Sequence, residues 1–153
     1  MDNRIKEHLK NLNKYYLLLR KIQKKDYQDF KKDEILQGGS ERFLQLAIES
    51  CLNIGNRLIS IEQFNKPIDT PETYADIFLQ LKNIGVIDGP FYDRLVKMTK
   101  FRNRLVHLYW EIDPQKVYEI IVDNLEDFKH FERDVVKFLK ASEQKEKSSK
   151  DAV

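Results

Sequence analysis

The segment FRNRLVHLYW, residues 101–110, combines two arginines, a histidine and an adjacent tyrosine and tryptophan. Arg102 carries a planar, permanently charged fork that matches phosphate oxygens in two-point contacts. His107 can take up and return a proton near neutral pH. Together they suit metal-free cleavage of an RNA phosphodiester. One group withdraws the 2′-hydroxyl proton or protonates the leaving 5′-oxygen, and the guanidinium stabilises the negative charge that develops at phosphorus.

Neighbouring side chains could support this chemistry. Asn103 could orient the histidine or bind a phosphate oxygen, and Tyr109 could stack on a base or hydrogen-bond a phosphate. Lys97, Lys100 and Arg104 add positive charge that would attract RNA. We therefore treat them as supporting, RNA-binding residues.

The net charge is only +2, so the overall charge does not predict nucleic-acid binding, but its distribution is uneven. Residues 1–32 are rich in Lys and Arg, and we interpret them as solvated helix faces. Residues 94–110 differ because they contain no Asp or Glu that could neutralise the charge locally. We expect this segment to attract a phosphate-rich ligand.

The spacing of the motif restricts its geometry. Five helical steps from Arg102 to His107 rotate by about 140°, so one unbroken helix would not place both on one face. Arg104 and His107, three residues apart, would share a face. Either the helix ends or bends near Val106, or a symmetric dimer brings two copies of the motif together.

Composition sets the remaining limits. Hydrophobic content of 41% and charged content of 34% predict a folded chain with a solvated surface, and few glycines and prolines favour helices. Cys51 is a single cysteine, and no stretch resembles a signal peptide or a membrane span, so we expect a cytoplasmic protein. No metal-ligand spacing is present, and we expect neither a metal nor a cofactor.

Apolar periodicity predicts five helices in an antiparallel bundle over residues 1–140. The first spans about residues 3–25, and the polar segment 26–39 with its two glycines is at least partly a connection. The second, residues 40–62, has an apolar face broad enough for a central helix. Cys51 lies on that face and is interpreted as a packing residue.

Capping signals delimit the other three helices. Thr70, Pro71 and Glu72 indicate the start of the third, and Gly85 its end. Asp88-Gly89-Pro90 begins the fourth, which leads into the motif. Asp113-Pro114 begins the fifth, and residues 141–153 are expected to form a disordered polar tail.

The segment RNRLVHLY resembles the motif of the HepT-like ribonuclease toxins of the HEPN superfamily: Arg, four residues, His, one residue, Tyr. ERFLQLAIESCLNIGNRLI is similar to that family's long second helix, and PETYADIFLQLKNIGVID to its middle segment. KMTKFRNRLVHLYWEIDPQKVYEII is similar to the stretch from the catalytic helix into the last one. The likeness covers about residues 1–140.

This resemblance implies an all-α homodimer whose paired motifs line a cleft at the two-fold axis and cut RNA without a metal. It implies that Arg102 and His107 are the catalytic pair, with Asn103 beside them. It further implies that an MntA-like nucleotidyltransferase antitoxin transfers AMP from ATP to Tyr109. The chain would then be the toxin of a type VII toxin–antitoxin system.

Two other interpretations remain open. Related HEPN proteins serve as non-catalytic subunits that present nucleotide or substrate to a nucleotidyltransferase, and the fold alone does not separate the two roles. The chain could also be a structural helical dimer. His8 and His130 are interpreted as surface residues without acidic or arginine clusters suited to catalysis.

Overall fold

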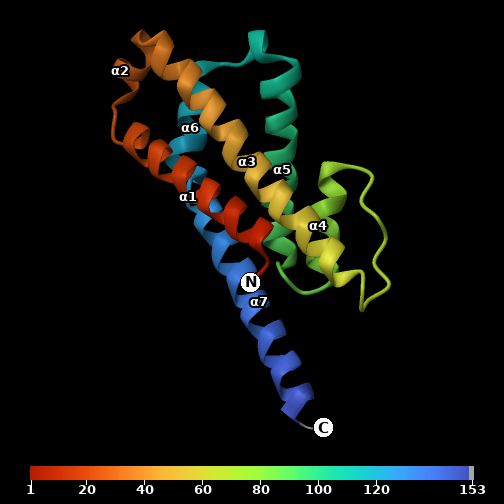
Figure 1. Cartoon of the computed structure of the whole chain (residues 1–153). Helices are drawn as coiled ribbons and strands as arrows, with labels where there is room; N and C mark the ends of the chain where they lie inside the picture. Colours follow the sequence, from red (N-terminus) through yellow and green to blue (C-terminus); the bar gives the residue numbers. More distant parts are fainter. Residues whose placement is uncertain (152–153) are drawn as a thin grey trace.

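The periodic apolar residues form a helical bundle, and the computed structural model, which describes residues 1–151, contains no strand within that range. The α-helices are α1 (Asn3–Gln23), α2 (Tyr27–Lys32), α3 (Glu34–Glu62), α4 (Tyr74–Asn83), α5 (Gly89–His107), α6 (Pro114–Asn124) and α7 (Glu126–Asp151). A 3₁₀ turn, η1 (Tyr109–Glu111), follows α5. The predicted all-α class is confirmed (Figure 1).

Helix α3 is the centre of the bundle and packs against each of the other α-helices of the described chain. Its apolar stripe, with Ala47, Ile54 and Leu58 buried, joins a single core cluster with the other helices. Cys51 lies in the same stripe, where burial raises the pKa of its thiol. The prediction of a central helix with a packing cysteine is confirmed.

The start of α5 follows its capping signal. Asp88 accepts a hydrogen bond from the amide of Phe91 at 2.8 Å, and Pro90 stands in the first turn. Gly85 has φ of +87°, which lets the chain turn between α4 and α5. Both predicted boundaries are confirmed, and they direct α5 towards the motif at its other end.

Residues 26–39 are more helical than predicted. Asp26 caps α2 through the amide of Asp29 at 2.9 Å, and Asp33 caps α3 through the amide of Leu36 at 3.0 Å. Both glycines therefore lie inside α3, because the Asp33 cap before them and the buried residues Ser40 and Leu44 after them outweigh the low helix propensity of glycine.

Helix α4 begins later than Thr70-Pro71 predicted. Thr73 is the N-cap, and it forms a capping box in which its hydroxyl accepts from the amide of Asp76 while the Asp76 carboxylate accepts from the amide of Thr73. This reciprocal pair satisfies two backbone donors at once, which Thr70 does not. Residues 63–73 consequently form a connection that ends beside the motif.

The predicted fifth helix is divided into α6 and α7 at Leu125, whose backbone torsions are still helical. Gln23 of α1 donates its side-chain amide to the carbonyls of Ile121 at 3.1 Å and Val122 at 3.3 Å. These bonds compete for the carbonyls that would continue the helix ladder. The two helices still follow one another directly, and α7 extends from the end of α6 towards the C-terminus (Figure 1).

The polar segment after Ala141 differs from the predicted disordered tail. Helix α7 continues to Asp151 because the segment is rich in Glu, Lys and Gln, which favour helix. The N-terminal amine also pairs with Glu143 at 3.2 Å. Residues 152–153 of the predicted tail lie outside the described residues. Within residues 1–151, no helix is both long and apolar enough to cross a membrane.

Candidate active site at the end of helix α5

Helix α5 ends within the motif, between His107 and Tyr109. The last helical residue is His107, and Leu108 leaves the helix with φ of −132° while its amide still bonds to the carbonyl of Arg104 at 2.8 Å. The end comes one residue after Val106, where the sequence predicted a helix end or bend. Arg102 and His107 are both helical, so they project in different directions.

Arg102 is held on one side of α5 by contacts from two other helices. Its Nη2 and Nε donate to one oxygen of Glu49 on α3, at 2.8 and 3.2 Å. Its guanidinium also lies over the ring of Tyr74, the first residue of α4, at 4.9 Å from the ring centre. Only 13% of the Arg102 side chain is exposed, so the group is fixed in one orientation.

Glu49 is kept ionised by the same contacts. Partial burial by itself raises the pKa of Glu49, but hydrogen bonds from Gln45 and Arg102 and the charges of Arg102 and Arg42 outweigh burial. The net result is a pKa below the ordinary value. The ion pair is therefore intact at neutral pH.

Asn103 connects Arg102 to a surface pocket that His107 also lines. Its Oδ1 accepts a hydrogen bond from Arg102 Nη1 at 3.3 Å. Because this contact assigns the oxygen, the amide NH₂ is left to donate elsewhere. Asn103 and His107 line one pocket of about 590 Å³, together with Asn56 of α3 and residues 71–74 and 77. The structure therefore brings Asn103 and His107 together at one pocket, whereas Arg102 does not line it and is connected to it only through Asn103.

His107 itself is exposed, and among the residues that the structure describes no side chain bonds to its ring. It stands four residues after Asn103, one helical turn further along, so the two side chains face the same pocket. Both ring nitrogens are free to contact a ligand. The pocket therefore offers an amide donor and a free imidazole, and the held Arg102 guanidinium lies behind the amide.

Tyr109 and Trp110 lie just beyond the helix, in η1. Each is 66% exposed, and their rings meet edge to face with centres 5.3 Å apart. The Tyr109 hydroxyl forms no bond within residues 1–151. The Tyr109 side chain is therefore accessible from solvent.

Lys97, Lys100 and Arg104 lie elsewhere. They line a second pocket of about 430 Å³ on the other flank of α5, between α3, α6 and α7. Within the described chain none of them forms an ion pair. The structure therefore does not place them around Arg102, although Arg104 lies one turn from His107 on the exposed ridge of α5.

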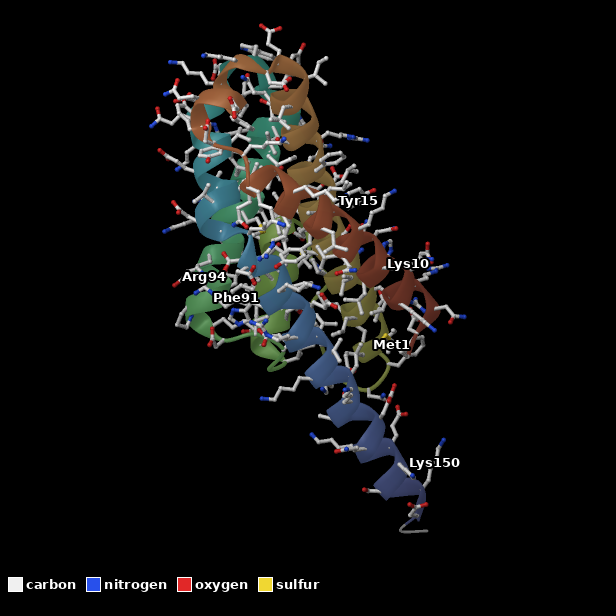
Figure 2. The ribbon with its side chains drawn as sticks, turned by 90° about the vertical axis from the view of Figure 1, so that its left-hand side faces the viewer. Met1, Lys10, Tyr15, Phe91, Arg94 and Lys150 are labelled. Carbon is white, nitrogen blue, oxygen red and sulfur yellow. The ribbon has the colours of Figure 1, made fainter. Side chains whose placement is uncertain are left out.

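His130, interpreted as a surface residue without an acidic or arginine cluster suited to catalysis, has both an acidic and an arginine neighbour in the structure. Its ring stacks on Phe91 with centres 3.7 Å apart, and its Nε2 lies 3.2 Å from Asp134. Its Nδ1 lies 3.2 Å from Arg94 Nη2. Because a guanidinium only donates, Nδ1 accepts and the ring proton sits on Nε2, towards Asp134. The cluster links α5 to α7. Figure 2 shows Phe91 and Arg94 of α5 on the side of the molecule next to α7.

Sequence reasoning missed two residues of the site. Tyr74 begins α4, and its ring supports the Arg102 guanidinium. Glu49 is the single acid between positions 42 and 61, and that isolation within an apolar helix was the available signal. Its partner is 53 positions away in the sequence, so no local spacing connects the two.

The fold and the motif define a class of protein. A family model described as "Ribonuclease HepT-like" matches residues 5–135. The chain belongs to this family.

Particular relatives agree with that assignment. The chain is 34% identical over 112 residues to the mRNA nuclease HepT of Shewanella oneidensis, covering 73% of this chain and 80% of that protein. It is 24% identical over 135 residues to the tRNA nuclease HepT of Aphanizomenon flos-aquae, covering 88% and 89%. Among solved structures, it resembles the tri-AMPylated Shewanella oneidensis HEPN toxin in complex with MNT antitoxin. The TM-score is 0.78 at 29% identity, covering 90% of this chain and 98% of that one.

Proposed function

We propose that this chain is the toxin of a type VII toxin–antitoxin pair and acts in the cytoplasm as a metal-independent endoribonuclease. Arg102 and His107 are its catalytic residues, and Asn103 assists them. The observation that carries the proposal is the fixed Arg102 guanidinium, joined through Asn103 to the pocket on which His107 opens.

Each group has a defined task in this reaction. His107 takes the proton of the RNA 2′-hydroxyl or gives a proton to the leaving 5′-oxygen. Arg102 uses Nε and Nη2 to bind Glu49, so Nη1, which donates to Asn103, is the nitrogen that stabilises charge on the phosphate oxygens. The free NH₂ of Asn103 donates to the same phosphate. No step needs a metal ion.

We further propose that the active form is a homodimer whose two motifs share one cleft. Arg102 and His107 point in different directions on one helix, and a second copy supplies the complementary group. The exposed apolar side chains of Leu108, Tyr109 and Trp110 beside the motif support an interface there.

Mixing inactive variants tests the shared cleft. Arg102→Ala and His107→Ala proteins are expected to be inactive alone and to regain part of the activity after subunit exchange, because a mixed dimer contains one complete set of groups. If mixed dimers form, as native mass spectrometry would show, and remain inactive, the composite cleft is wrong.

Neutralisation occurs at Tyr109, where an MntA-like nucleotidyltransferase adds AMP. Each AMP brings a phosphodiester charge and an adenine ring two residues from His107, which repels RNA phosphates and fills the cleft. Incubation with ATP and the partner should raise the intact mass in AMP-sized steps. An unchanged mass, or the same rise in Tyr109→Phe, would contradict this assignment.

The nuclease proposal is tested by cleavage of RNA in EDTA. Wild-type protein should cut, and His107→Ala should lose cleavage while its helix content and oligomeric state are retained. Equal cleavage by His107→Ala would remove the histidine from the mechanism. Tight calorimetric binding of ATP or AMP by a wild-type protein that does not cut RNA would favour the alternative, a nucleotide-binding subunit of a nucleotidyltransferase.

A further inference from the structure

The second pocket, between α3, α5, α6 and α7, has the features of a ligand site. Its volume of about 430 Å³ falls in the range of roughly 300–1,000 Å³ typical of such sites. Its floor is apolar, with Met98, Phe101 and Ile120 half-buried over the buried Ile48 and Phe128. Its rim carries five basic side chains: Arg94, Lys97, Lys100 and Arg104 from α5, and Lys116 from α6.

The charges on this rim are almost entirely uncompensated. Arg94 pairs with Asp127 at 3.2 Å, and Asp127 is the only acid that lines the pocket. The other four cations form no ion pair within residues 1–151. Four unpaired cations around an apolar floor favour an anionic ligand that also has a flat or apolar face.

A second copy of this chain does not fit the pocket. A two-fold interface centred there would bring the same unpaired cations of both copies face to face, and like charges across an interface are strongly unfavourable. The exposed apolar surface is also small, since Ile48 and Phe128 are already buried in the core. Charge complementarity therefore points to a nucleic-acid ligand.

We propose that this pocket is a nucleotide subsite for the RNA strand, next to the cleaved phosphate. One base lies on the floor formed by Met98, Phe101 and Ile120, and its phosphate is bound on the rim, with Lys116 as a contact from outside the motif helix. This proposal rests on the proposed nuclease function. It adds a contact between the RNA substrate and the flank of α5 opposite Arg102.

The path between the two pockets supports a single strand that uses both. Arg104 lines the second pocket and His107 the first, and the two are three residues apart on the exposed ridge of α5. Three residues correspond to about 4.5 Å along the helix and about 60° around it. A strand whose phosphate lies at His107 therefore reaches Arg104 with a neighbouring nucleotide, and Arg104 lines the same pocket as Lys116.

The experiment measures binding without cleavage. In a His107→Ala background, the Kd for a fluorescent single-stranded RNA is measured across a range of salt concentrations. Lys116→Ala should raise the Kd several-fold and reduce the slope of log K against log salt by about 0.7, the loss of one phosphate contact on a single strand. Ile120→Ala should raise the Kd and leave the slope unchanged, because it removes base contact without charge.

The matched control is Lys10→Ala, an exposed lysine on α1 that removes the same charge from another face (Figure 2). It should leave the slope unchanged. A Lys116→Ala slope equal to that of Lys10→Ala would overturn the subsite. The subsite would also be overturned if Lys116→Ala bound RNA as tightly as the control but associated more weakly with the nucleotidyltransferase or with a second copy of the chain.

The two proposals fail separately. If wild-type protein does not cut RNA but Lys116→Ala still reduces the salt slope, the nuclease proposal is wrong and the pocket remains an RNA site. If wild-type protein cuts RNA and Lys116→Ala binds like the control, the subsite is wrong and the nuclease remains.

Discussion

The two flanks of α5 differ in how their charges are held. On one flank, Arg102 is bonded to Glu49, stacked on Tyr74 and bonded to Asn103. On the other, Lys97, Lys100, Arg104 and Lys116 surround an apolar floor without carboxylate partners in the described chain. Helix α5 therefore carries a rigid, compensated arginine and three free cations, and α6 adds the fourth, Lys116.

This difference separates two physical requirements. A group that stabilises charge in a transition state must be in place beforehand, which the contacts of Arg102 provide. Groups that attract an RNA strand need uncompensated charge more than a fixed position. The held flank is therefore expected to determine the rate of cleavage, and the open flank the affinity for RNA.

The largest expected effect is that of Arg102→Lys. Lysine keeps the charge but loses the fork that binds Glu49 and leaves Nη1 for phosphate. We expect kcat to fall by about 10²-fold or more, the usual cost of losing one charge-stabilising donor. RNA affinity in a non-cleaving background should change little. Single-turnover kinetics measure kcat, and a binding titration measures the affinity for RNA. A loss confined to affinity would contradict the assignment of the cleavage rate to the Arg102 flank.

Glu49→Gln is expected to act through position alone. The substitution weakens the anchor of Arg102 without touching RNA, so kcat should fall about 10-fold, below the 10²-fold that a displacement of about 1 Å can cause. KM should be nearly unchanged. Glu41→Gln on the same helix is the control, because Glu41 forms no ion pair in the described residues. A faster Glu49→Gln enzyme would mean that Glu49 restrains Arg102 instead of positioning it.

The packing that places Tyr74 can be tested at Gly55. A Cβ there would lie 2.7 Å from Ile77 Cγ2 and 3.1 Å from Leu81 on α4. Overpacking costs about 1–3 kcal/mol, against about 1 kcal/mol gained in helix propensity. Gly55→Ala should therefore lower Tm by a few degrees.

Gly39→Ala is the matched comparison on the same helix, because its Cβ would lie 3.8 Å from Phe43, an ordinary contact. It should raise the stability of the chain by about 0.5–1 kcal/mol. Thermal unfolding followed by circular dichroism checks both variants. Equal shifts of Tm in the two would show that the spacing of α3 and α4 is not tight at Gly55.

The smallest effect concerns the pH dependence of the Glu49–Arg102 pair. The pKa of Glu49 is below its ordinary value of 4.5 in the folded chain. The contribution of the pair to stability is therefore fully present above pH 4.5 and is lost as the pH falls through the lower, folded value. The difference in Tm between wild type and Glu49→Gln should be constant above pH 4.5 and shrink below it. A difference that grows on acidification would contradict the assignment.

Much of this arrangement could be predicted from local patterns. Apolar periodicity predicted the bundle and its central helix, and Asp88-Gly89-Pro90 predicted where α5 begins. The His130–Asp134 contact was readable from four-residue spacing, but it was overlooked. The contacts of Glu49 and Tyr74 with Arg102 were not readable, because they join residues far apart in sequence through the packing of α3, α4 and α5. For the same reason, the sequence grouped Lys97, Lys100 and Arg104 with the motif, although packing gives them a pocket of their own.

The central claim is that Arg102 and His107 cleave RNA through its own 2′-hydroxyl. The most direct measurement is mass spectrometry of the ends of RNA fragments produced in EDTA. Attack by the 2′-oxygen predicts a 2′,3′-cyclic phosphate on one product and a 5′-hydroxyl on the other, and none of either with His107→Ala protein. Fragments with 3′-hydroxyl and 5′-phosphate ends would contradict the account.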